Sequence, residues 1–226
     1  MQKGFTLAEV LITIGIIGLV AALTFPILLK HHRKTVIETS LKKFYTSTNQ
    51  AVLLSVAQNG ETKDWQFPSD TPEEIENWYN IYFKKYLNTH RTGIESVDGR
   101  NYFTIYFADG TAAKLNYKGH DWYFCLNAKY LQDFNKWHGS QCFMFGFYPV
   151  SGALSNSPSY SSKNFRNKGI EPYVKDIMTD ETGNNMTDEN GNFVHTTEKD
   201  LYSQKAWSKI IQLNNWQIPK DYPVRY

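Results

Sequence analysis

Glu9 is the residue near the start of the chain whose type and position most require a chemical explanation. It is the only charged residue between Phe5 and Leu29, where every other side chain is apolar or small and uncharged. A carboxylate costs about 2.5–3.5 kcal/mol at the centre of a membrane-spanning helix and less near its end. Glu9 is therefore expected either to pair with a cation inside the membrane or to reach water at the interface, and the first hypothesis makes it a functional residue.

Cys125 and Cys142 are the two cysteines of the chain. Neither a C-x-x-C pair nor a spacing typical of zinc ligands occurs, which argues against a redox or metal motif. In a protein exported from the cytoplasm, a disulfide between them is the first interpretation, and two separate buried thiols are the alternative.

Catalytic motifs are absent from the sequence. It contains no G-x-S-x-G, H-E-x-x-H, P-loop or dinucleotide-binding fingerprint, and its 6 histidines have no ligand spacing. The 24 basic and 22 acidic residues nearly balance, so the net charge of +2 gives no reason to expect binding to nucleic acid. The sequence therefore predicts a protein that is not an enzyme and needs no cofactor.

The apolar run from Phe5 to Leu29 is long enough to span a membrane. As a helix it extends about 37 Å, against about 30 Å for the hydrocarbon core of a bilayer. A cleaved secretory signal is one interpretation, because Lys3 precedes the run and Val20-Ala21-Ala22 offers small residues for cleavage. A plain anchor is another. Neither gives Glu9 a role, which favours a more specific function for the segment.

The residues Gly4-Phe5-Thr6-Leu7-Ala8-Glu9, followed by the apolar run, resemble the processing signal of type IV prepilins and type II secretion pseudopilins. In that family a prepilin peptidase in the membrane cuts after the glycine and methylates the new amine. The resemblance implies cleavage after Gly4, N-methylation of Phe5 and an assembly role for Glu9. It also implies that Pro26 is the proline at which the family's long first helix bends.

The resemblance also implies the partners and the location of the protein. A processed subunit carries a cationic amine at Phe5, and Glu9 of a neighbouring subunit can pair with it and set the register of assembly. The expected partners are prepilin peptidase, other pilin or pseudopilin subunits and an inner-membrane assembly platform. The expected location is the cytoplasmic (inner) membrane, crossed once with the head outside the cytoplasm, and then a pilus or pseudopilus.

The basic residues around the span favour the opposite orientation. Lys30, Arg33 and Lys34 follow the span, whereas Lys3 is the only basic side chain before it. The positive-inside rule taken alone would place the body in the cytoplasm. We follow the processing motif, because it is the more specific signal.

The predicted organisation is a leader at 1–4, a transmembrane helix at 5–29, an amphipathic extension of the helix at 30–60 and an extracytoplasmic head at 61–226. Apolar residues recur at helical spacing up to Val56, and Asn59-Gly60 is a suitable end for the helix. We expect this apolar stripe to pack on the sheet of the head. The predicted fold class is α+β, a pilin-like lollipop whose long N-terminal helix packs on a mainly antiparallel β-sheet.

Within the head, a capped helix is predicted over 71–87, and its aromatic stripe is expected to belong to the core. A hairpin is predicted around the turn Asp109-Gly110. Strands are predicted at 101–107, 111–117, 122–126 and 142–150, a surface loop at 151–162 and a helix at 201–213.

An acidic, turn-rich stretch is duplicated near the C-terminus: 178–185 and 186–193 agree at six of eight positions. Two units are too few for a solenoid, so we interpret the stretch as a local duplication in a solvated loop. Some pseudopilins bind calcium in a C-terminal loop, which makes Asp180 and Asp188 weak calcium candidates. The glycine positions do not match an EF-hand loop.

A second functional hypothesis concerns binding. Trp122, Trp137 and nearby tyrosines could form an adhesive or carbohydrate-stacking surface on the head. The alternative function is then a membrane-anchored surface binding or adhesion module presented on such a filament. An exposed aromatic patch of more than a few hundred Å² would favour it.

Overall fold

The computed structural model describes residues 4, 6–132, 139–149, 169–175, 177–178, 180, 184–192, 194–203 and 205–224. The chain divides into two compact units, one ending at Val36 and the other beginning at Ile37. This boundary lies inside the first helix, so the second half of that helix belongs to the same compact unit as the sheet.

Helix α1 (Leu7–Asn59) is continuous over 53 residues. It ends before Gly60, whose φ of +79° is the left-handed conformation that glycine commonly adopts after a helix. In the first unit every residue from Leu7 to Arg33 is exposed, and the side chain of Leu7 is 77% exposed. A helix that is apolar all round is suited to lipid, and α1 is long and apolar enough to cross a membrane.

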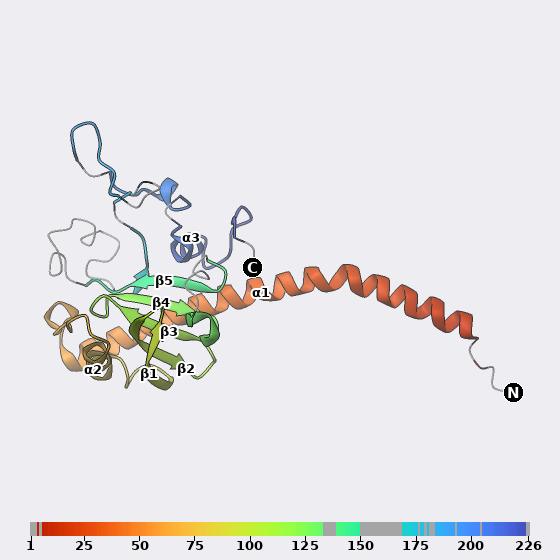
Figure 1. Ribbon diagram of the computed structural model, residues 1–226, viewed down its shortest axis with the longest axis horizontal. Coiled ribbons are helices and arrows are strands. Elements are labelled where there is room, and N and C mark those ends of the chain that lie inside the picture. Colours follow the sequence, from red (N-terminus) through yellow and green to blue (C-terminus); the bar gives the residue numbers. More distant parts are fainter. Residues whose placement is uncertain are drawn as a thin grey trace. The chain divides into compact units, whose positions relative to one another are not determined.

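The second unit contains a six-stranded antiparallel sheet in which each strand pairs with the next along the chain. Figure 1 shows this sheet in green and teal, beside the second half of α1. The antiparallel order and the long N-terminal helix confirm the predicted α+β class. The strands are β1 (Thr89–Val97), β2 (Arg100–Phe107), β3 (Ala112–Asn116), β4 (Asp121–Cys125), β5 (Cys142–Gly146) and β6 (Glu171–Pro172).

The second half of α1 packs its apolar stripe on the sheet, as the sequence predicts. Phe44 lies at the centre of this contact, with its ring centroid 4.3 Å from that of Phe124 in β4 and 4.9 Å from that of Phe145 in β5. The ring of Phe107, at the end of β2, is 6.0 Å away. Aromatic pairs at such distances contribute about 0.5–1.5 kcal/mol beyond the burial of their area.

Helix α2 (Pro72–Tyr82) begins as predicted, with the side chain of Thr71 accepting a hydrogen bond from the backbone N–H of Glu74. Thr71 and Glu74 have the spacing of a capping box, but only half of it forms, because the carboxylate of Glu74 accepts from the backbone N–H of Ser69 and not from that of Thr71. The aromatic stripe belongs to the core, as predicted. Its side chains are at most 8% exposed at Trp78, Tyr79, Tyr82 and Phe83.

The C-terminal segment, by which we mean the described residues from Gly169 onward, contacts α1 through pairs of residues that are far apart in the sequence. The carboxylate of Glu38 accepts a hydrogen bond from the backbone N–H of Ile218 at 2.7 Å. The side-chain amide of Asn49 donates to the carbonyl of Ile170 at 2.8 Å. Gly169 approaches α1 so closely that a Cβ at this position would overlap the side-chain oxygen of Asn49.

Three predicted elements are shorter than expected. The helix predicted over 71–87 ends at Tyr82, because the backbone N–H groups of Phe83 and Lys84 both donate to the carbonyl of Tyr79 and close a turn. The strand predicted at 142–150 ends at Gly146, and the helix predicted at 201–213 is α3 (Trp207–Leu213). The loop predicted at 151–162 lies outside the described residues.

The sequence pattern does not predict strand β1. This is an edge strand whose side chains are mostly exposed or half-buried, and Gly93 interrupts it, so it lacks the alternation of a half-buried strand. The signal that marks it is Asp98-Gly99. These two residues have φ values of +49° and +76° and form the two-residue turn between β1 and β2, for which Asp-Gly is a favoured pair.

Candidate processing and assembly segment

Thr6 and Glu9 form reciprocal hydrogen bonds with each other at the start of α1. The backbone N–H and the hydroxyl of Thr6 both donate to Oε2 of Glu9 at 2.8 Å. The backbone N–H of Glu9 donates to the hydroxyl oxygen of Thr6 at 3.3 Å. This reciprocal arrangement is a capping box, in which side chains satisfy N–H groups that have no partner within the first helical turn. Glu9 therefore stabilises the start of its own helix.

Thr6 is a functional candidate that the sequence reasoning above does not single out. Its signal is present, because Thr6-Leu7-Ala8-Glu9 has the S/T-x-x-E spacing of a capping box directly before an apolar run. Both bonds to the carboxylate use Oε2, and among the described residues Oε1 accepts no hydrogen bond. Because an ionised carboxylate can accept about four hydrogen bonds, Glu9 retains an acceptor for a further partner.

Both members of the capping box follow the predicted cleavage position. Gly4 is exposed, and a Cβ added to it would meet no atom within 4 Å among the described residues. Phe5 lies outside the described residues. Removal of residues 1–4 would take away neither Thr6 nor Glu9, so the precursor and the cleaved chain can start α1 with the same hydrogen bonds.

Pro26 lies inside α1, which continues on both sides of it. Proline has no N–H group, so it cannot donate to the carbonyl four residues earlier, at Ala22. The hydroxyl of Thr24, two residues before the proline, donates to the carbonyl of Val20 at 2.9 Å. The bend at Pro26 that the resemblance implies stays a prediction.

The two cysteines meet across neighbouring strands. Cys125 at the end of β4 lies opposite Cys142 at the start of β5, and their sulfur atoms are joined in a disulfide. Both residues are fully buried, in a cluster with Ala112 and Leu131. The bond links positions 17 residues apart in the chain and holds β4 and β5 in one register.

The carboxylate of each of the two calcium candidates accepts a hydrogen bond from a backbone N–H group four residues later in the chain. Oδ1 of Asp180 accepts from the backbone N–H of Asn184 at 2.9 Å, and Oδ1 of Asp188 accepts from the backbone N–H of Asn192 at 2.8 Å. In the part of the chain that the structure describes, no three His, Cys, Asp or Glu side chains are grouped to hold a metal ion. Calcium binding by these aspartates stays an untested prediction.

Val194 joins the starts of the two duplicated stretches by backbone hydrogen bonds. The backbone N–H of Met178 donates to the carbonyl of Val194 at 2.9 Å, that of Met186 to Met178 at 2.8 Å, and that of Val194 to Met186 at 3.0 Å. Met178 and Met186 begin the two duplicated stretches and Val194 follows the second, and the three backbones close a ring of hydrogen bonds.

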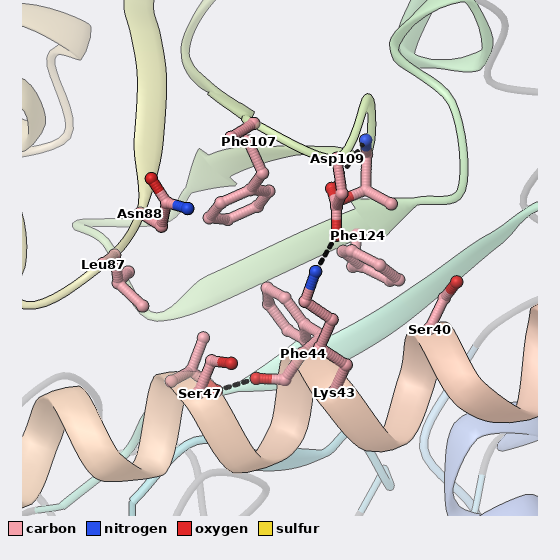
Figure 2. A pocket seen from close by; sticks show the side chains of 12 residues that line it. Ser40, Lys43, Phe44, Ser47, Leu87, Asn88, Phe107, Asp109 and Phe124 are labelled. Carbon is pink, nitrogen blue, oxygen red and sulfur yellow. Dashed lines mark hydrogen bonds and ion pairs between the residues drawn. The ribbon is translucent and has the colours of Figure 1, made fainter.

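A small pocket lies between α1 and the turn that joins β2 to β3 (Figure 2). Its volume is about 80 Å³, and the rings of Phe44, Phe107 and Phe124 line it. At its rim, Nζ of Lys43 lies 2.7 Å from Oδ2 of Asp109. Pockets for small-molecule ligands usually measure about 300–1,000 Å³. This pocket is therefore too small for such a ligand.

Trp122, which the adhesion hypothesis placed on a binding surface, lies in the core. Its side chain has no exposed area, and its indole N–H donates to the carbonyl of Gly119 at 3.0 Å. Trp122 cannot contribute to an exposed aromatic patch, so this part of the hypothesis is wrong. Trp137 lies outside the described residues.

Comparison with known families accounts for nearly the whole chain. A model described as a family of unknown function (DUF6613) matches residues 27–226. The chain belongs to this family. In this DUF6613 member, a second model, the prokaryotic N-terminal methylation motif, matches residues 1–25. Searches of curated proteins and of solved structures returned no match.

The methylation motif is the prepilin-type signature of type IV pilins and pseudopilins, and it confirms the resemblance inferred from Gly4, Phe5 and Glu9. It makes this DUF6613 chain a pilin-like subunit that is processed by prepilin peptidase. The long apolar helix that follows fits the single-pass membrane anchor of such a subunit.

Proposed function

We propose that the chain is a structural, non-enzymatic subunit of a type II secretion pseudopilus or a type IV pilus. The observation that carries the proposal is the methylation motif at 1–25, placed on a helix whose residues are exposed on every side from Leu7 to Leu29. Such a helix needs an apolar environment all round. Lipid supplies it in the precursor, and the same segments of neighbouring subunits supply it in the filament.

Glu9 supplies the contact that sets the register between subunits. Cleavage leaves a cationic amine at Phe5, and burial of this charge in an apolar filament requires an anionic partner. Oε2 of Glu9 is occupied by Thr6 of the same chain, which leaves Oε1 for the Phe5 amine of a neighbour. A buried ion pair of this kind is better suited to specifying register than to adding stability.

The disulfide supports a head outside the cytoplasm. Disulfides persist in oxidising compartments and are rare in the cytosol. The bond between Cys125 and Cys142 is therefore consistent with the orientation that the processing signal implies. In this orientation the positive-inside rule does not explain Lys30, Arg33 and Lys34, and these residues need another role.

The N-terminal mass of protein extracted from membranes tests the processing step. With prepilin peptidase present, the chain is expected to begin at N-methylated Phe5, and without the peptidase it is expected to begin at Met1. Gly4→Val adds a branched side chain at the cleavage position and is expected to block processing, whereas the matched control Thr6→Ser is expected to be processed. A wild-type chain that begins at Met1 in the presence of active peptidase would contradict the proposal.

Immunogold labelling separates the two kinds of filament. Label on long filaments that can be sheared from the cell surface would assign the subunit to a type IV pilus. Processed subunit that remains in the cell envelope and cross-links to the assembly platform would assign it to a pseudopilus. Processed subunit that enters neither structure would contradict the proposed function.

A further inference from the structure

The residues that follow the apolar run form a ring of basic side chains around α1. Lys30, His31, His32, Arg33 and Lys34 are consecutive in the helix. Since an α-helix has 3.6 residues per turn, five consecutive residues go more than once around its axis. Residues 30–33 are exposed and Lys34 is half-buried. We call these five residues the basic collar.

The lysines and the arginine of the collar share one side of the helix. Lys30, Arg33 and Lys34 have the i, i+3, i+4 spacing that places side chains on a common face. The two histidines occupy the rest of the circumference. The chain has no acidic residue between Glu9 and Glu38, so this whole stretch of α1 carries a net positive charge.

A helix that spans the membrane from Leu7 would place the collar at the depth of the lipid headgroups. The helix from Leu7 to Leu29 extends about 34 Å, against about 30 Å for the hydrocarbon core and about 40–45 Å for the bilayer with its headgroups. With the capped end of α1 at one surface, Lys30 is reached as the helix leaves the hydrocarbon at the other. Cationic side chains at this depth meet the phosphate groups of the lipids.

We propose that the basic collar binds the phosphate groups of anionic phospholipids on the membrane face where α1 emerges. Each Lys or Arg close to an anionic membrane surface strengthens the attraction about fivefold. With the head outside the cytoplasm, the positive-inside rule cannot account for the collar, whereas lipid binding accounts for it in either orientation. The inference requires α1 to span the membrane, but it does not require cleavage or assembly.

Native mass spectrometry of the full-length protein in detergent micelles tests the proposal, with phosphatidylglycerol and phosphatidylcholine as the probes. The wild-type protein is expected to bind phosphatidylglycerol at least tenfold more tightly, and this preference should weaken as salt is added. A collar variant carries Lys30→Gln, Arg33→Gln and Lys34→Gln and is expected to lose the preference. A control variant carries the same charge change at exposed positions of the head, Lys63→Gln, Lys84→Gln and Lys199→Gln, and is expected to retain it.

Equal binding of the two lipids by the wild-type protein, or equal loss of preference in both variants, would overturn the proposal. Displacement of the lipid by millimolar inorganic phosphate would also overturn it, because it would indicate a site for a free anion. A wild-type protein without lipid preference, whose collar variant alone loses cross-links to other subunits, would assign the collar to a protein partner. The uncleaved Gly4→Val precursor is expected to show the wild-type preference, so this outcome is independent of the processing test.

Discussion

Thr6 donates two hydrogen bonds to one oxygen atom of Glu9, and each has a donor–acceptor distance of 2.8 Å. The carboxylate thus has a role within its own chain before any neighbouring subunit is present. That role is to complete the first turn of α1, and it uses one of the two carboxylate oxygens. The role proposed for the other oxygen, pairing with the amine of a neighbour, can therefore be separated from capping by mutation.

Glu9→Gln retains an oxygen that can complete the capping box but removes the charge that would pair with the Phe5 amine. We expect this variant to insert into the membrane with α1 intact. Its incorporation into filaments should fall at least tenfold, because an unpaired buried charge costs about 3–5 kcal/mol. The measurement compares the amounts of subunit in the filament and membrane fractions.

Thr6→Val is the reciprocal variant, because it removes the hydroxyl and retains the charge of Glu9. Loss of a helix cap costs about 1 kcal/mol, so hydrogen exchange in the first turn of α1 should accelerate while incorporation stays close to the wild-type level. Normal incorporation of Glu9→Gln would contradict the pairing role. Equal losses in the two variants would show that capping alone explains the need for Glu9.

The disulfide is expected to contribute strongly to the stability of the head. A bridge between residues 17 apart restricts the unfolded chain and contributes about 3 kcal/mol in the chain-entropy model. The double variant Cys125→Ala and Cys142→Ala, which leaves no free thiol, should lower the free energy of unfolding by this amount in urea titrations. Reduction of the wild-type protein is the control. Equal urea midpoints for oxidised wild-type protein and the double variant would contradict this prediction.

Two neighbouring residues of the head give its stability opposite dependences on pH. Burial lowers the pKa of His120 to about 4, and Nδ1 of this residue donates to the carbonyl of Phe147 at 2.6 Å. Burial raises the pKa of Asp121 to about 7, and its carboxylate accepts a hydrogen bond from the hydroxyl of Tyr148. The stability that neutral His120 provides is lost as the pH falls from 6.5 to about 4. The stability that protonated Asp121 provides is lost as the pH rises from 3.8 to about 7.

His120→Asn and Asp121→Asn should reveal these two dependences separately. The asparagine at 120 retains a donor for Phe147 but does not titrate, so the free energy of unfolding should fall as the pH rises from 4 to 7. The asparagine at 121 retains an acceptor for Tyr148, so the free energy should rise by about 3 kcal/mol between pH 4 and 6.5. The wild-type protein should show a flatter profile in urea titrations. Parallel profiles for all three proteins would exclude titration of both residues.

Gly169→Ala should loosen the contact between the C-terminal segment and α1. The new Cβ would overlap the side-chain oxygen of Asn49, whose amide is fixed by hydrogen bonds to the carbonyls of Tyr45 and Ile170. Overpacking of this kind costs about 1–3 kcal/mol. Gly93→Ala is the matched control, because a Cβ there meets its neighbours at an ordinary distance of 3.7 Å.

A double-mutant cycle checks the origin of this cost. Asn49→Ala removes the overlapping atom, so adding Gly169→Ala to it should cost about 1 kcal/mol less than Gly169→Ala in the wild-type protein. Additive losses would show that the backbone of Gly169, and not the contact with Asn49, causes the destabilisation.

The parts of the molecule that could be predicted from the sequence depend on short spacings. Gly4, Phe5 and Glu9 lie within a few positions of each other, and the turn at Asp109-Gly110 marks its own hairpin. The capping box of Thr6 and Glu9 has the same kind of short-range signal, although the apolar run around Glu9 equally suits a role within the membrane. The sequence does not predict strand β1, because an exposed edge strand has little hydrophobic pattern.

The contacts that fix the C-terminal segment have no such local signature. The hydrogen bond between Asn49 and Ile170 joins residues 121 positions apart, and that between Glu38 and Ile218 joins residues 180 positions apart. Each depends on where the sheet places the chain after it leaves β5. Neither partner has a residue type that would reveal the other, so only the folded structure brings them together.

The contact between Glu38 and Ile218 also makes the folding of the head depend on residues far along the chain. A chain that stops before Ile218 would carry the entire N-terminal signal but would leave Glu38 without this donor. We expect the head of such a chain to remain incompletely folded while the chain is in the membrane. Truncated subunits would then be exposed to proteases before they could enter a filament, so this contact favours subunits that retain the chain up to Ile218.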